Sequence, residues 1–137
     1  MVGGMSFYKL GYDGHVVRAR CVVMAGDDVD VMGTVSSVDG PLDLTDYEAY
    51  MAITTGYGEA PVLDFSSDAL AGAICAIAVG GVDGTLTFAA DGEDTLELAD
   101  LDYVWDLTLT NPDGRSRIIA RGPAVVLLRA AAVEVVP

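Results

Sequence analysis

The chain has 137 residues, of which 52% are hydrophobic and 16 are glycine, and its formal net charge at pH 7 is −14. This length is typical of one domain with a hydrophobic core, and the hydrophobic content argues against an intrinsically disordered chain. An acidic surface repels phosphate backbones, so the charge argues against sequence-independent binding to DNA or RNA.

Alternating and apolar stretches predict strands along most of the chain. Residues 1–14 come first, and because they are rich in glycine and lack a clear period, we expect an N-terminal arm. The predicted strands then follow over residues 15–24, 29–37, 47–54, 62–65, 73–79, 85–88, 103–110, 118–122 and 124–135. Residues 42–46 predict an extended linker, and residues 94–101 a helical turn or an irregular crossover. Along residues 73–79 the side chains on both faces of the predicted strand are apolar, which is typical of a strand covered on both sides.

The strongest local signal is a β-hairpin over residues 103–122. One face of its first strand is formed by Tyr103, Trp105, Leu107 and Leu109. We expect this face to be buried, with Trp105 as its anchor. The sequence Asn-Pro-Asp-Gly at 111–114 reverses the chain, because proline presets its own φ and glycine accepts the positive φ that a tight turn needs.

These elements predict an all-β fold, namely an antiparallel β-sandwich or barrel of seven to nine short strands. The domain is expected over residues 15–128, and residues 129–137 continue the last strand or form a tail. An antibody-type topology is not favoured, because Trp105 follows both cysteines instead of lying between them. Cys21 and Cys75 lack metal-binding spacing and lie in apolar stretches, so we expect buried free thiols.

Basic and acidic residues are distributed unevenly. Residues 21–114 contain no lysine, arginine or histidine, yet they hold every acidic residue except Asp13 and Glu134. The candidate partner-interface residues are the six arginines outside this block: Arg18, Arg20, Arg115, Arg117, Arg121 and Arg129. If the first and last strands are neighbours, these arginines form one basic edge on an acidic body; the alternative is that they are scattered and solvated. In a regular strand Arg117 and Arg121 project to the same side.

The sequence shows no catalytic, cofactor-binding or metal-binding motif. His15 is the single histidine, and no nucleophile signature accompanies it. The acid clusters at 27–30 and 91–94 do not match a calcium-binding loop, so we interpret them as solvated turn residues. Residues 1–9 lack the apolar core of a signal peptide, so no signal peptide is expected. Charged residues interrupt the apolar stretch over 118–137, so no membrane span is expected.

Tyr57 is the one candidate for a sugar contact. It lies in a loop between two glycines, and an exposed aromatic ring is a platform for stacking a carbohydrate. An ordinary loop tyrosine is the alternative interpretation.

The order of several motifs resembles a family of virion proteins. The first half contains Gly26-Asp27-Asp28, Val38-Asp39-Gly40-Pro41 with Asp43-Leu44-Thr45, and the alternation of Tyr47, Ala49, Met51 and Ile53. The second half contains Asp83-Gly84-Thr85-Leu86-Thr87 and the stretch from Tyr103 to Gly122. Over residues 25–126 the chain resembles the N-terminal domain of phage baseplate upper proteins and related short virion proteins of tailed bacteriophages.

The resemblance implies an immunoglobulin-like antiparallel β-sandwich and a structural role in the virion, without enzymatic activity or cofactors. The implied partners are other virion structural proteins, in a homo-oligomer or another symmetric assembly that forms in the host bacterial cytoplasm. Because no receptor-binding module follows the sandwich, we expect a capsid-surface, neck, tail or baseplate accessory subunit. The alternative function is a carbohydrate-binding module on the virion surface, with Tyr57 at its site.

Overall fold

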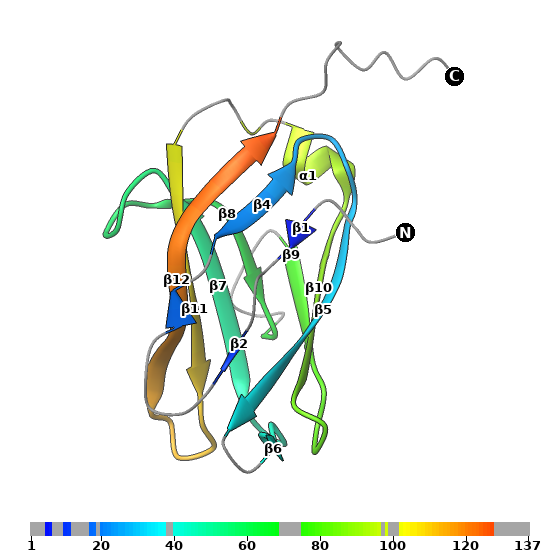
Figure 1. The fold of residues 1–137 in the computed structure, drawn as a ribbon, viewed down its shortest axis with the longest axis vertical. Helices are drawn as coiled ribbons and strands as arrows, with labels where there is room; N and C mark the ends of the chain where they lie inside the picture. Colours follow the sequence, from blue (N-terminus) through cyan, green and yellow to red (C-terminus); the bar gives the residue numbers. More distant parts are fainter. Residues whose placement is uncertain are drawn as a thin grey trace.

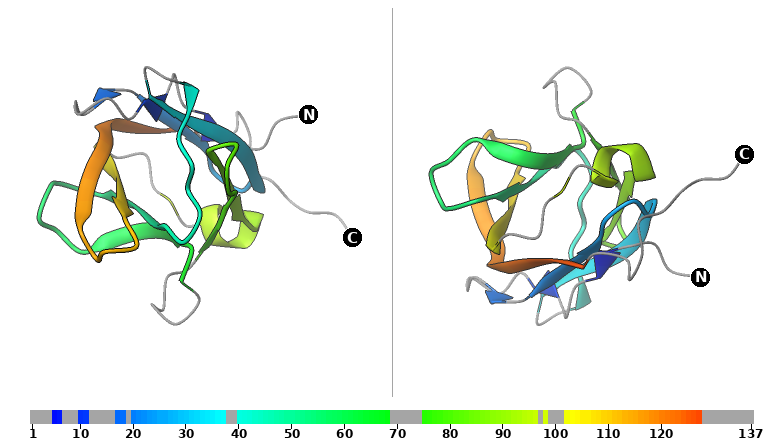
Figure 2. Two further views of the ribbon diagram at one scale, coloured as in Figure 1. Left: turned by 90° about the horizontal axis from the view of Figure 1, so that it is seen from below. Right: turned by 90° about the horizontal axis from the view of Figure 1, so that it is seen from above.

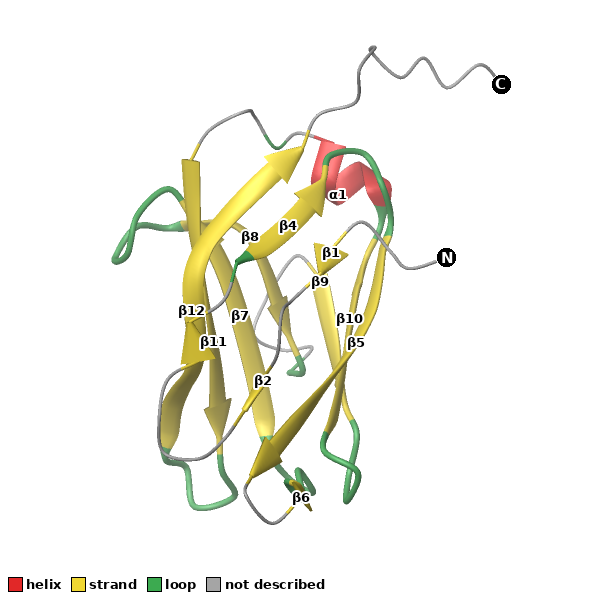
Figure 3. Ribbon diagram, in the orientation of Figure 1, coloured by secondary structure: helices red, strands yellow, loops and turns green. Residues whose placement is uncertain are grey.

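A computed structural model of the chain describes residues 5–6, 10–11, 17–18, 20–37, 40–68, 75–96, 98 and 102–127. These residues form a curled β-sheet and one short helix, α1 (Gly92–Leu96) (Figures 1 and 3). The predicted all-β class is therefore confirmed.

The described residues contain eight strands of four residues or more and four strands of two residues. The longer strands are β4 (Cys21–Met24), β5 (Val29–Ser37), β7 (Glu48–Thr54), β8 (Pro61–Ser66), β9 (Cys75–Val79), β10 (Thr85–Ala90), β11 (Asp102–Thr110) and β12 (Ser116–Leu127). The two-residue strands are β1 (Met5–Ser6), β2 (Leu10–Gly11), β3 (Val17–Arg18) and β6 (Gly40–Pro41).

The strands pair in the order β1-β4-β12-β11-β7-β8-β9-β10-β5-β2, with β3 also on β12 and β6 on β5. Seen along the long axis, the sheet curls around the core like an incomplete barrel (Figure 2). The described parts of the predicted N-terminal arm belong to this sheet, because β1 pairs with β4 and β2 pairs with β5. The arm therefore contributes strands to both ends of the sheet.

The sheet is mixed, so the predicted antiparallel pairing holds for some pairs of strands and not for others. Strand β12 runs parallel to β3 and β4, β2 runs parallel to β5, and β8 runs parallel to β9. The other neighbouring pairs are antiparallel. The parallel pairs join segments that do not form a simple hairpin, and hairpin signals in a sequence report only antiparallel neighbours.

The core lies inside the curl and is built by alternating residues. The predicted inner face of β11, with Tyr103, Trp105, Leu107 and Leu109, is buried as expected. Strands β8 and β10, on either side of β9, contribute Phe65 and Phe88, whose rings pack edge to face with centroids 5.9 Å apart. Both cysteines are free and buried, which confirms that prediction.

One buried residue was not predicted, and one local prediction is wrong. Leu44, placed in an extended linker, is fully buried, and its amide donates to the Gly81 carbonyl at 2.9 Å. Strand β9 is covered on one side only, because Ala76 and Ala78 are exposed while Cys75 and Ile77 are buried. Alanine is apolar but small, and its exposure costs little, so an alanine-rich stretch does not require burial on both faces.

Thr95 fixes the helix α1 to the turn between β4 and β5. Its side chain is fully buried, and its hydroxyl accepts from the Gly26 amide at 3.0 Å and donates to the Asp27 carbonyl at 2.9 Å. This hydroxyl joins segments that are almost 70 residues apart in the sequence.

We expect Thr95→Val to lower the free energy of unfolding by about 1–3 kcal/mol, because the partly buried Gly26 amide loses its acceptor. Thr95→Ser keeps the hydroxyl and removes one methyl, which costs about 1 kcal/mol. Urea unfolding of the two variants measures the difference. Equal losses, or a larger loss for the serine variant, would show that packing of the methyl matters more than the hydrogen bond.

Candidate functional site

The predicted first strand, residues 15–24, contains β3 and β4, and both pair with the last strand β12, as the basic-edge hypothesis requires. The Cα partner of Arg18 on β3 is Arg121 on β12, and Arg20 follows two residues later. Arg18 and Arg20 are both exposed, and so are Arg115 and Arg117 in the hairpin between β11 and β12. Arg129 lies outside the described residues. Five of the six candidate arginines thus lie along β3, β12 and the segments that adjoin them.

A β-bulge separates Arg117 from Arg121. The register between β11 and β12 shifts at Leu107, so that Ile119 and Ala120, consecutive residues, are both buried. Arg121 lies opposite Asp106 on the outer face, whereas Arg117 lies opposite Leu109, a residue of the inner face. The expectation that Arg117 and Arg121 share one side is therefore wrong, because a bulge inserts one residue and reverses the alternation.

Tyr57 and Arg121 form one contact, although they were predicted as parts of different sites. The Arg121 guanidinium carbon lies 4.0 Å from the centre of the Tyr57 ring, which is a cation–π geometry. The Tyr57 hydroxyl lies 3.3 Å from the Gly122 carbonyl oxygen, to which it donates. The loop between β7 and β8 thus reaches β12 across the outer face of the sheet. One face of the Tyr57 ring is covered by the guanidinium.

The Arg121 side chain also faces a carboxylate. Burial raises the pKa of the Asp106 carboxyl above its ordinary value, and the positive charge of Arg121 offsets part of that rise. On the same sheet face the Tyr50 hydroxyl donates to the Asp64 carboxylate at 2.7 Å. Burial raises the pKa of Tyr50, and the hydrogen bond to Asp64 adds to the rise. This face therefore presents a row of partly buried polar groups on β12, β11, β7 and β8.

We expect Asp106→Asn to stabilise the protein at neutral pH. The folded-state pKa of Asp106 is raised, so the ionised carboxylate is less favourable in the folded than in the unfolded chain. The wild type therefore loses stability as the pH rises from 3.8, the ordinary pKa, through the raised value. The gain from asparagine should be present at pH 7 and vanish below the ordinary pKa.

Thermal unfolding of both forms across this pH range measures the effect. Asp102→Asn, at the exposed start of the same strand, is the matched control and should change little. A lower melting temperature for Asp106→Asn at pH 7 would mean that the attraction to Arg121 outweighs the cost of burial.

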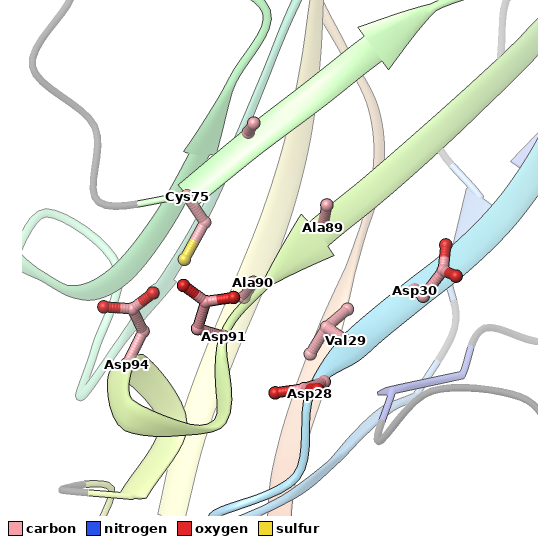
Figure 4. A pocket seen from close by; sticks show the side chains of 9 residues that line it. Asp28, Val29, Asp30, Cys75, Ala89, Ala90, Asp91 and Asp94 are labelled. Carbon is pink, nitrogen blue, oxygen red and sulfur yellow. The ribbon is translucent and has the colours of Figure 1, made fainter.

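A second surface feature is a hollow of about 540 Å³ beside α1. Its lining includes four acids, Asp28, Asp30, Asp91 and Asp94, together with Cys75 and alanines of β9 and β10 (Figure 4). Burial, with the charges of Asp94, Asp64 and Asp91, raises the pKa of the Cys75 thiol to about 12. Burial also raises the pKa of Cys21 to about 12. Both thiols are therefore protonated at neutral pH and are poor nucleophiles.

The part of the chain that the structure describes contains no group of three or more His, Cys, Asp or Glu residues placed to hold a metal ion. Among the same residues, no helix has the length and apolar character needed to span a membrane. His15, the one histidine, lies outside the described residues.

Comparison with models of known protein families and with curated protein sequences gives no match to this chain. Sequence reasoning identified the arginines and Tyr57 separately, but it missed their contact and the hollow. A bulge and a folded-back loop depend on pairings between distant segments, for which a single sequence carries no local signal.

Proposed function

We propose that this chain is a structural subunit of a tailed-phage virion that works through protein–protein contacts and has no enzymatic activity. The observation that carries this proposal is the pairing of β3 with β12, which places Arg18 beside Arg121 on an acidic β-domain. Arginine makes bidentate contacts with carboxylates, and such contacts select the partner and its orientation. A polarised subunit of this kind suits a repeating assembly.

We also propose that the fold is immunoglobulin-like, in agreement with the resemblance to phage baseplate upper proteins. One half of the curled sheet has the order β4-β12-β11-β7-β8, and the other has β9-β10-β5. Without β6, the strands from β5 onward can be assigned in chain order: β5 is B, β7 is C, β8 is C′, β9 is D, β10 is E, β11 is F and β12 is G. The first half then contains strands G, F, C and C′, and the second half contains D, E and B. This is the distribution of strands in the immunoglobulin fold. A two-residue pairing of β8 with β9 joins the halves into one sheet.

The virion assignment predicts that reversing exposed charges on the basic edge blocks incorporation without unfolding the domain. Arg20→Glu with Arg117→Glu changes two exposed side chains and leaves Arg121 on Tyr57. We expect the melting temperature to change little, because the median contribution of surface charges is small. Incorporation into particles should fall by about tenfold or more, since like charges then meet at the contact.

The measurement is the amount of the chain in purified virions, with its position determined by immunoelectron microscopy. The variant with lysine at both positions keeps the charge and is the matched control. Absence of the wild-type chain from particles would overturn the virion assignment. Normal incorporation of the folded double glutamate variant would overturn the role of the basic edge.

The carbohydrate-binding alternative receives less support from the site. A sugar stacks on a free aromatic face, but the guanidinium of Arg121 covers one face of Tyr57 at 4.0 Å. A glycan array with the wild type and Tyr57→Ala separates the two functions. Binding that depends on Tyr57 would favour the carbohydrate module.

A further inference from the structure

The outer face of β9, β10 and β5 differs from the rest of this acidic protein. Its exposed residues are small or uncharged over most of the face: Ala76, Ala78, Ala89, Met32 and Thr34. The register places Met32, Thr87 and Ala78 in one row across the three strands, and Asp30, Ala89 and Ala76 in the next. Met32 is 67% exposed, which is high for a large apolar side chain on a strand. Such a weakly charged sheet face is suited to packing against another protein.

The end of this face near α1 is hollowed because its floor is made of alanines. Ala76 and Ala89 line the hollow of about 540 Å³, and Asp30, Asp91 and Asp94 lie around it (Figure 4). A fourth carboxylate, Asp28, is engaged by the Gly92 amide at 2.6 Å. The surface therefore combines an apolar floor with a negative rim, and it fits an apolar side chain flanked by positive charges.

The segment with this complementary chemistry is the hairpin of the same chain. Arg115, Arg117 and Ile118 are all exposed there, so the hairpin offers two positive charges for the rim and one apolar side chain. The strands that form the hollow have no base of their own, because residues 21–114 contain no lysine, arginine or histidine. The turn of the hairpin lies at the opposite end of the molecule from α1, so one copy cannot place its hairpin in its own hollow (Figure 1).

We propose that the hairpin between β11 and β12 of one copy docks on the β9-β10-β5 face of a second copy, with Arg115 and Arg117 against the acidic rim of the hollow. The contact is heterologous, so each copy has one free hairpin and one free hollow, and the copies assemble head to tail. This inference rests on the proposed function and names the partner as another copy of this chain.

Sedimentation velocity of the purified chain tests the contact. We expect the average mass to rise with protein concentration and to fall when the salt is raised from about 0.05 to 0.5 M, because exposed charges are then screened. Arg115→Glu with Arg117→Glu should weaken self-association by about tenfold or more. Arg18→Glu with Arg20→Glu makes the same change in net charge on another part of the basic edge, and it should associate like the wild type.

A mixing experiment tests the head-to-tail geometry. Ala76→Gln with Ala89→Gln fills the floor of the hollow, and this variant should be monomeric at concentrations where the hairpin variant is monomeric. Mixed in equal amounts, the hollow variant supplies an intact hairpin and the hairpin variant supplies an intact hollow, so dimers and no larger species should form. Ala60→Gln, at an exposed loop position, is the control for the glutamine substitution. Circular dichroism checks that each variant is folded. A second variant of the hollow, Asp91→Asn with Asp94→Asn, removes two negative charges from its rim and should weaken association.

The inference is overturned if the wild type stays monomeric at all concentrations in low salt, if the Arg18 and Arg20 control loses association equally, or if the mixture stays monomeric or forms larger species. These outcomes leave the virion assignment intact, because incorporation into particles is measured separately. A chain that is monomeric in solution but incorporated through its basic edge would bind a different virion protein.

Discussion

Replacing Trp105 with alanine is expected to lower the free energy of unfolding by about 3–5 kcal/mol. Trp105 is 1% exposed and lies in the middle of β11, between β7 and β12, in the register that pairs it with Ile53 and Gly122. Its removal takes a large apolar surface out of the core and leaves a cavity that β-strands cannot close by a small shift. A domain near the lower end of the ordinary range of stability, about 5–15 kcal/mol, then retains little of it.

Trp105→Phe is the matched control for this variant, because it keeps an aromatic ring and should cost less. Circular dichroism in urea is the suitable measurement, since Trp105 is the one tryptophan of the chain and its fluorescence is lost on substitution. An unchanged unfolding midpoint for Trp105→Ala would contradict the role of Trp105 as the core anchor.

Gly84→Ala is the second substitution with a large expected effect, a loss of about 3 kcal/mol. The φ of Gly84 is +69°, and a Cβ there would lie 2.6 Å from the Val35 carbonyl oxygen and 2.8 Å from the Leu42 carbonyl oxygen. A left-handed conformation costs an alanine about 1–2 kcal/mol, and overpacking adds about 1–3 kcal/mol. The backbone cannot yield easily, because the Val35 amide donates to the Gly84 carbonyl at 2.7 Å and the Leu42 amide donates to the Val35 carbonyl at 2.9 Å.

Gly114→Ala separates the two causes. Gly114 has a similar φ of +84°, but nothing lies within 4 Å of a Cβ at that position. Its substitution should cost only the conformational part, about 1–2 kcal/mol. Urea unfolding midpoints of the two variants give the difference. Equal losses would show that close approach of the backbone at Gly84 contributes nothing.

Local signals in the sequence predicted much of the fold. The alternation over residues 103–110 identified the inner face of β11, and Asn-Pro-Asp-Gly identified its turn, where the Asn111 side-chain oxygen accepts from the amides of Asp113 and Arg115. Both features depend on residues that are close in the sequence. The burial of Leu44 was not predicted, because the alternation of Leu42 and Leu44 is too short to distinguish a buried segment from an exposed linker.

The candidate site was predicted less completely than the fold. The uneven charge of the chain indicated where the arginines lie, and the pairing of β3 with β12 brought Arg18 and Arg121 together as the hypothesis required. The sequence could not predict that Arg121 lies on the outer face of the sheet, because the bulge at Ile119 arises from the pairing of β12 with β11. The exposure of Ala76 and Ala89 could not be predicted from the sequence either, since alanine occurs on both buried and exposed faces.

The parallel pairing of β4 with β12 has a consequence for the way the chain folds. It joins Cys21 to Ala124 and Met24 to Leu127, so about a hundred residues must be synthesised before β4 meets its partner. Closing so long a loop is entropically costly before any contact is gained, and domains rich in such pairings fold in about milliseconds to seconds. On the ribosome, β4 therefore has to wait for almost the whole chain, and its exposed apolar residues need protection from aggregation during that time.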